Sequence, residues 1–144
     1  MAQFLLSGLI LVSAYYENLL MRMQEERVVY FLSVALIFIG IIGLLLTVVS
    51  FRQKVTPFPE PRRNSVLVQH GIYSVIRHPM YLFVSILAVG YCFFFNAFNS
   101  LFLCAFLVLF FDYKIRKEEL YLRQQFPEYA EYQKRTKKLI PYIY

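Results

Sequence analysis

Histidine and cysteine are scarce in this chain of 144 residues, which has two of each. The histidines are His70 and His78, and the sequence shows neither a nucleophilic triad nor the ligand spacing of a metal cluster. Cys92 and Cys104 both lie in apolar runs, where a free thiol is usually a small packing residue. The sequence therefore predicts no metal site, and its cysteines say little about the redox compartment.

Charged residues are also few, at 17%, whereas hydrophobic residues make up 59% and the mean hydropathy is +0.52. A soluble core of this size does not need so much apolar surface. Residues 28–51 carry no charge and are long enough to cross a bilayer as one helix. The uncharged stretch 79–111 is too long for one span, and polar residues at 96–100 divide it into a helical hairpin.

The first apolar segment is interrupted by Glu17 and Asn18, and we expect Glu17 at the membrane interface. A cleaved signal peptide is the alternative, but no Lys or Arg precedes the apolar run and no clear cleavage site follows it. We therefore predict an all-α, polytopic membrane bundle in one domain, with spans at about 3–21, 28–51, 79–95 and 99–113. A cytoplasmic helical segment follows the last span.

Basic residues are unevenly distributed among the connecting segments. Of the 15 Lys and Arg, five lie in 52–77 and eight from Lys114 onward, whereas the first loop has only Arg22 and Arg27 and the hairpin has none. The positive-inside rule places both rich segments, and both termini, in the cytoplasm. The net charge of +6 is then explained by topology and by attraction to membrane lipids, without a nucleic-acid partner.

Residues 69–81 stand at the cytoplasmic mouth of the third predicted span. Pro79 suits the first turn of a helix and excludes the residue before it from helical geometry, so Arg77 and His78 lie at a helix entrance. Unpaired N–H groups and the dipole there favour an anion. The alternative is that Arg77 and His78 are interfacial anchors, with Tyr81 in an aromatic belt.

A second polar cluster follows the fourth predicted span and returns to the same side of the membrane. It contains Lys114, Arg116, Lys117, Glu118 and Glu119. Because Lys114 and Glu118 are four residues apart, the simple alternative is an exposed helical ion pair worth about 0.3–0.5 kcal/mol.

Together the two clusters resemble the isoprenylcysteine carboxyl methyltransferases and the related phosphatidylethanolamine methyltransferases. The resemblance covers about 65–141, and it rests on Gly71, Tyr73, Arg77, His78, Pro79, Tyr81, Glu118, Glu119, Leu122, Phe126, Tyr129, Tyr132 and Pro141. It implies S-adenosyl-L-methionine as cofactor and a lipid-like or prenylated small molecule as substrate. The implied cofactor-binding residues are Ser65, Val66, Leu67, Val68, Gly71, Tyr73, Arg77, His78, Pro79, Met80, Tyr81 and Glu118.

The resemblance also implies catalytic roles for Lys114, Arg116 and Glu119, and substrate binding by Lys114 and Arg135. The chain departs from the family pattern in three places. Lys114 replaces a common Arg, which exchanges a planar fork for a point charge, and Arg116 is expected to share its role. Phe83 stands where many members have Gly, and the segment 126–129 is one residue shorter than usual.

Methyl transfer from a sulfonium mainly requires alignment of donor and acceptor and exclusion of water. A carboxylate acceptor needs no general base, whereas a phospholipid amine needs one, for which Glu119 and His78 are the candidates. Two further alternatives remain. The chain also resembles membrane sterol reductases that use NADPH, and a non-catalytic scaffold would bind neither ligand.

Overall fold

The structure is a computed structural model that describes residues 2–21, 27–51 and 67–144, and within these ranges it is all-helical, as predicted. The helices are α1 (Ala2–Met21), α2 (Arg27–Phe51), the 3₁₀ helix η1 (Gly71–Ser74), α3 (Pro79–Phe94), α4 (Leu101–Gln125) and α5 (Tyr129–Arg135). Among the described helices, α2 alone is both long and apolar enough to cross a membrane, and α3 is apolar but shorter. α4 continues past residue 113 as one helix to Gln125, because the charged residues there are good helix formers.

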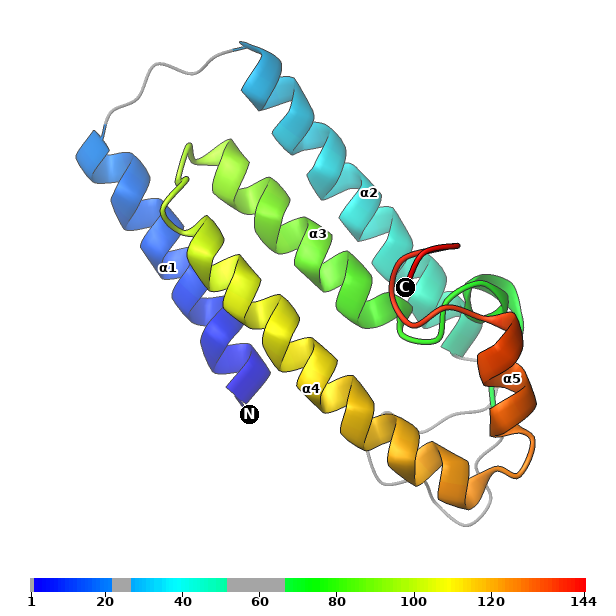
Figure 1. Cartoon of the computed structure of the whole chain (residues 1–144). Helices are drawn as coiled ribbons and strands as arrows, with labels where there is room; N and C mark the ends of the chain where they lie inside the picture. Colours follow the sequence, from blue (N-terminus) through cyan, green and yellow to red (C-terminus); the bar gives the residue numbers. More distant parts are fainter. Residues whose placement is uncertain (1, 22–26, 52–66) are drawn as a thin grey trace.

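Helices α2 and α3 pack side by side over most of their length (Figure 1). Glycines on α2 permit the close approach: a Cβ at Gly43 would lie 2.1 Å from the ring of Phe83, and one at Gly40 would lie 2.5 Å from Leu87. Phe83, which departs from the family pattern, therefore packs directly against Gly43 of α2.

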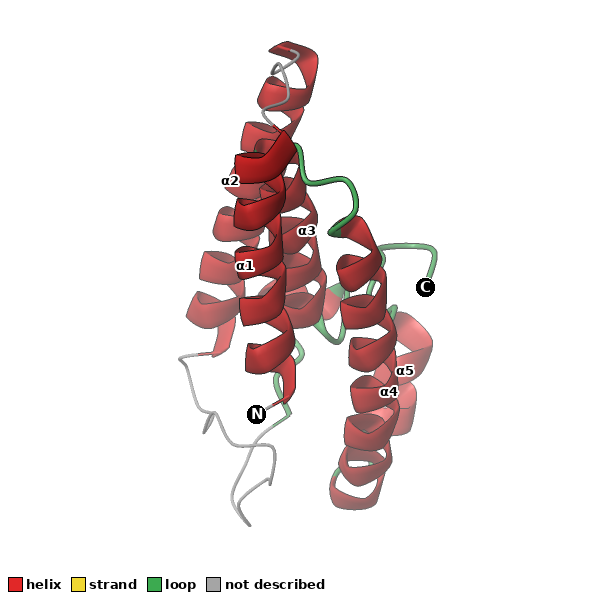
Figure 2. Ribbon diagram, turned by 90° about the vertical axis from the view of Figure 1, so that its left-hand side faces the viewer, coloured by secondary structure: helices red, strands yellow, loops and turns green. Residues whose placement is uncertain are grey.

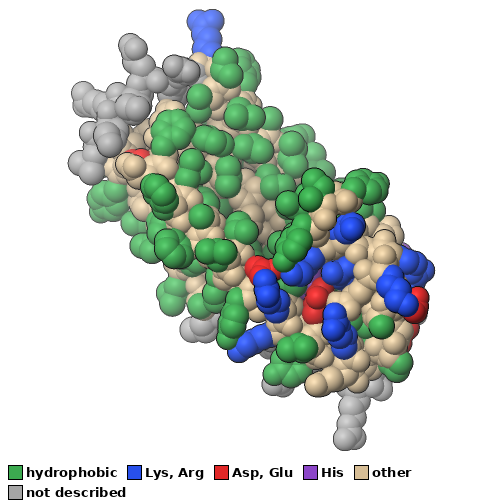
Figure 3. Space-filling view, in the orientation of Figure 1, with side chains coloured by type: hydrophobic (Ala, Val, Ile, Leu, Met, Phe, Trp, Pro, Cys, Tyr) green, Lys and Arg blue, Asp and Glu red, His purple; other side chains and the backbone are tan. Residues whose placement is uncertain are grey.

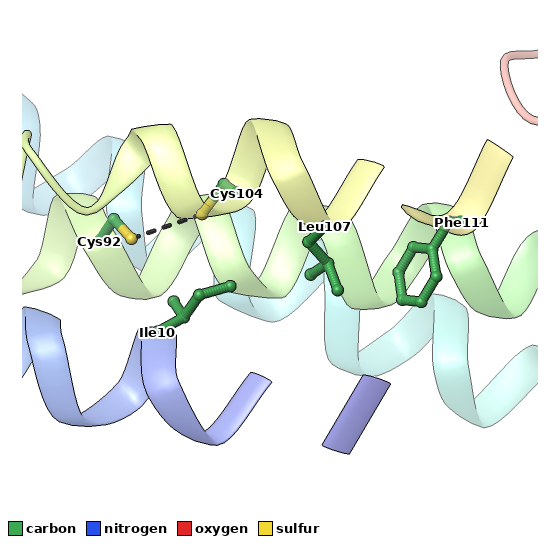
Figure 4. Packing of buried hydrophobic residues seen from close by; sticks show 5 residues of the cluster. All are labelled: Ile10, Cys92, Cys104, Leu107 and Phe111. Atoms are coloured by element: carbon green, nitrogen blue, oxygen red, sulfur yellow. Dashed lines mark hydrogen bonds between the residues drawn. The ribbon is translucent and has the colours of Figure 1, made fainter. Parts of the chain in front are cut away.

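The core lies where α1, α3 and α4 meet (Figure 4). It contains Ile10, Cys92, Cys104, Leu107 and Phe111, all nearly inaccessible to solvent. The two thiols are free and their Sγ atoms are 3.6 Å apart, so they pack as small apolar groups against each other.

The turn between α3 and α4 is held by α1. Asn96 has a positive φ of 52°, which reverses the chain, and the carboxylate of Glu17 accepts hydrogen bonds from the backbone N–H groups of Asn99 and Ser100 at 2.9 and 3.1 Å. Asn18 donates to the carbonyl of Phe95. Glu17, expected at the membrane interface, thus acts as a cap for the N-terminus of α4.

Charged side chains gather at the opposite end of the bundle. α4 extends beyond its neighbours there and carries α5 beside its last turns (Figure 2). Lys, Arg, Asp and Glu cluster over this end, whereas apolar side chains cover most of the visible remainder (Figure 3). The fold therefore brings the two polar clusters of the sequence to one end of an apolar bundle.

Candidate active site

The approach to α3 is shaped by η1 and by a proline. Gly71 has φ +61°, and a Cβ there would lie 2.6 Å from the hydroxyl of Ser50, so both backbone and space require glycine. His78 is the N-cap of α3 with φ −125°, and Pro79 begins the helix, as predicted. The side chains of 77 and 78 are consequently turned toward α4.

The C-terminal segment pairs with this approach in parallel. The N–H groups of Arg77 and His78 donate to the carbonyls of Lys137 and Lys138 at 2.8 and 3.1 Å, and the N–H of Lys137 donates to Val75 at 3.0 Å. Residues about 60 positions apart thus close one wall of the site.

Arg77 is largely buried, and its guanidinium is paired within the protein. Its Nε donates to the carboxylate of Glu119 at 2.8 Å, and its Nη1 donates to the carbonyls of Gln133 in α5 and of Thr136 directly after α5. Burial alone would raise the pKa of Glu119, but contacts from His78 and Arg77 outweigh it and lower this pKa to about 2. Glu119 is therefore a permanently ionised partner of Arg77 near neutral pH.

His78 lies between the two carboxylates of α4 and is also buried. Its Nδ1 is 3.7 Å from Glu118 and its Nε2 is 3.5 Å from Glu119. Despite that distance, Nε2 forms no hydrogen bond with another described residue. The ring stacks beside Tyr81 with centroids 5.9 Å apart. α3 therefore holds His78 against both acids of α4.

Lys114, Tyr81 and Glu118 form the more accessible half of the cluster. The hydroxyl of Tyr81 donates to Glu118 at 2.5 Å, and the Lys114 ammonium lies over the Tyr81 ring at 5.2 Å and 3.8 Å from Glu118. The Lys114 and Glu118 side chains are 32% and 25% exposed. The pair is thus partly buried within a larger cluster, in contrast to the exposed ion pair of the simple alternative. Lys114 also donates to Gln3 of α1 at 2.6 Å.

Tyrosines line the inner side. The hydroxyl of Tyr132 donates to the carbonyl of Tyr73 at 2.6 Å, and that of Tyr129 lies 3.4 Å from Glu119. Burial and the charge of Glu118 raise the pKa of Tyr73 to about 12. These phenols therefore remain neutral donors near neutral pH, and they tie α5 to the approach to α3.

Several residues predicted for the site lie at its edge or beyond. Arg116 is 69% exposed and pairs with Asp112 at 2.7 Å, and Arg135 donates to Gln69 at 3.2 Å. Met80 is partly exposed, Leu67 and Val68 are half-buried, and Ser65 and Val66 lie outside the described residues. In the described part of the chain, no three His, Cys, Asp or Glu residues are grouped to hold a metal ion.

Sequence reasoning missed two contributors to the cluster. Gln3 belongs to an apolar helix far from the motif, and Thr136 contributes through its backbone carbonyl, which no side-chain pattern reveals. Tyr129 and Tyr132 were part of the motif, and their contacts with Glu119 and Tyr73 give them a place in the site.

Comparison with known proteins adds two relatives. The chain is 34% identical over 108 residues to the cobalt-zinc-cadmium resistance protein CzcN of Cupriavidus metallidurans, covering 74% of this chain and 49% of that protein. It is 33% identical over 116 residues to the nickel-cobalt-cadmium resistance protein NccN of Alcaligenes xylosoxydans xylosoxydans, covering 76% and 52%. The chain thus spans about half the length of these curated relatives.

The family model of the phospholipid methyltransferases matches residues 28–129. This range contains α2 except its first residue, the approach to α3, the α3–α4 hairpin and both acids of the cluster. It confirms the relationship that the two sequence clusters indicated. The chain belongs to the phospholipid methyltransferase family, a family of membrane-associated methyltransferases.

Proposed function

We propose that this chain transfers a methyl group from S-adenosyl-L-methionine to a carboxylate on a lipid-like or prenylated small molecule. One observation carries the proposal: at the entrance of α3, Tyr81 donates a hydrogen bond to Glu118 and His78 lies within 3.7 Å of both acids of α4, with the Lys114 ammonium beside them. Both ligands would then be held by one cluster at the charged end of the bundle.

The residues present suit the cofactor. S-adenosyl-L-methionine, when bound, supplies a methyl group activated by a positively charged sulfur, together with an ammonium, a carboxylate and ribose hydroxyls. Glu118 is a partly exposed acceptor for the ammonium or the hydroxyls, and it receives one short bond, from Tyr81. The first-turn N–H groups of Met80 and Tyr81 have no acceptor within α3 and suit the carboxylate.

The proposed methyl acceptor, a carboxylate, follows from the charged groups of the cluster. Lys114 offers a cation to an acidic acceptor, and a carboxylate needs no base to attack a methyl group. An amine would have to lose a proton, but Glu119, with a pKa of about 2, is a poor base near neutral pH. His78 would remain as the base, but its buried ring is less accessible to a lipid head group than the Lys114 ammonium. The geometry therefore favours the carboxylate over the phospholipid amine.

We also propose the topology that places this cluster in the cytoplasm. α1 to α4 would each cross the membrane, with both termini on the cytoplasmic side. Support comes from the polar end and the apolar remainder seen in Figure 3 and from the thirteen basic residues in the segments 52–77 and 114–144. The cofactor would enter from the cytoplasm and the lipid tail from the bilayer.

The test is calorimetry on the purified protein in a neutral detergent with S-adenosylmethionine, its demethylated product and NADPH as separate titrants. We expect micromolar binding of the first two and no heat with NADPH. Saturable binding of NADPH alone would support a function like that of the sterol reductases. If none of the three compounds binds, the protein would be a non-catalytic scaffold that retains the fold.

A further inference from the structure

Helix α1 precedes the 28–129 range that the family model matches, yet one of its side chains reaches the candidate site. The Nζ of Lys114 donates to Oε1 of Gln3 at 2.6 Å, across 111 positions of sequence. Figure 1 shows the N-terminus of α1 beside α4, and Lys114 belongs to the middle of that helix by its position in the sequence. This chain therefore completes the surroundings of Lys114 with a residue from outside the family segment.

The contacts of Lys114 leave some of its N–H donors available. Glu118 is 3.8 Å away, beyond hydrogen-bonding distance, and its nearer oxygen already accepts from Tyr81 at 2.5 Å. The short bond of Lys114 goes to the neutral amide of Gln3. An ammonium has three N–H donors, so this bond fixes the flexible side chain and leaves donors for another acceptor.

We propose that Gln3 is a positioning residue that holds the Lys114 ammonium toward an oxyanion, carboxylate or phosphate, on the lipid-like acceptor. The inference rests on the proposed function and specifies the acceptor further. A neutral amide fixes the lysine without neutralising it, whereas a carboxylate in the same place would compete with the acceptor. Gln3 thereby sets a preference for an anionic head group over a neutral one of equal size.

The experiment measures that preference directly, without turnover. N-acetyl-S-farnesylcysteine and its methyl ester are titrated calorimetrically into the protein in neutral detergent, and dodecyl phosphate is compared with dodecanol. For the wild-type protein we expect the anion to bind about tenfold more tightly than its neutral counterpart, the size of one charge-assisted hydrogen bond. A preference within the farnesylcysteine pair would indicate a carboxylate acceptor, and a preference within the dodecyl pair would indicate a phosphate.

Gln3→Glu should abolish the preference, because the new carboxylate pairs with Lys114. Gln124→Glu, which adds the same group at an exposed position near the end of α4, should keep it. A Gln3→Glu protein that still prefers the anion tenfold would overturn the proposal. If Gln3→Glu does not fold, Gln3→Leu decides: a reduced preference supports positioning, and an unchanged one refutes it.

Binding of S-adenosylmethionine is measured on the same samples. An unchanged anion preference in both Gln3 variants, together with normal cofactor binding, would refute the role of Gln3 and leave the proposed methyl transfer intact. Absence of cofactor binding, with an anion preference that depends on Gln3, would refute methyl transfer and leave an anionic-lipid site.

Discussion

The Nε of Arg77 lies 2.8 Å from the carboxylate of Glu119, and this ion pair joins the approach to α3 to the charged end of α4. Both side chains are about one-tenth exposed, and Arg77 also donates to carbonyls within α5 and directly after it. Arg77 therefore holds three segments of the chain together around His78.

Arg77→Ala should destabilise the protein strongly, because Glu119 would remain buried without its main partner. Loss of one member of a buried pair costs about 3–5 kcal/mol. The readout is the unfolding temperature in detergent. Lys134→Ala, which removes an exposed pair with Glu131, serves as the control and should cost under about 1 kcal/mol. An equally small effect of Arg77→Ala would contradict the structural role given to this pair.

Acid should weaken the same region. The pKa of Glu119 falls from an ordinary 4.5 to about 2 in the folded protein, so folding favours the ionised form. This contribution is fully present above pH 4.5 and is lost as the pH falls toward 2. Unfolding temperatures measured across this range should fall more steeply for the wild type than for Glu119→Gln. Parallel curves for the two proteins would show that Glu119 is not the group responsible.

Different mutations should affect binding of the cofactor and binding of the acceptor. Glu118→Gln and His78→Ala are expected to weaken S-adenosylmethionine binding roughly ten- to hundredfold, the effect of losing a contact worth about 1.5–3 kcal/mol. Lys114→Ala should leave cofactor binding intact and raise the KM for farnesylcysteine analogues. Glu128→Ala, at an exposed position, is the control. The opposite pattern, with Lys114 needed for the cofactor and Glu118 dispensable, would reverse the two assignments.

Topology can be tested at the hairpin. Phe98 is 42% exposed, whereas Cys92 and Cys104 are buried, so a thiol introduced by Phe98→Cys should be the reactive one. We expect a membrane-impermeant maleimide to label it from outside intact cells, with the wild-type protein as the unlabelled control. Labelling only after the cytoplasmic side is exposed would place the hairpin on the wrong side of the proposed membrane orientation.

The side chains at positions 43 of α2 and 83 of α3 should compensate for each other in size. Gly43→Ala places a methyl group against the Phe83 ring and should cost about 1–3 kcal/mol, as overpacking does. Adding Phe83→Ala should recover part of that loss, whereas Gly8→Ala, where a Cβ meets nothing within 4 Å, should be neutral or stabilising. Additive losses in the double variant would show that the two positions do not pack against each other.

Much of this arrangement was accessible from sequence because its signals are local. Uncharged runs predicted the helices, although α4 continues past its run to Gln125, Pro79 predicted the start of α3, and the motif identified both polar clusters. Contacts between distant residues carried no such signal. The cap that Glu17 provides to Ser100 joins positions 83 apart, and the Gln3–Lys114 bond joins positions 111 apart. The sequence does not show which segment a polar residue in an apolar helix will contact, because its partner is known only from the structure.

The pairing of Arg77 and His78 with Lys137 and Lys138 has a consequence for synthesis. Chains emerge from the ribosome N-terminus first, so every helix from α1 to α5 is made before the strand-like segment that closes the site. Until residue 138 has left the ribosome, the backbone N–H groups of Arg77 and His78 lack these acceptors. Helices α1 to α5 can thus form while the site is still open, and the backbone pairing that closes the site is made after all of them.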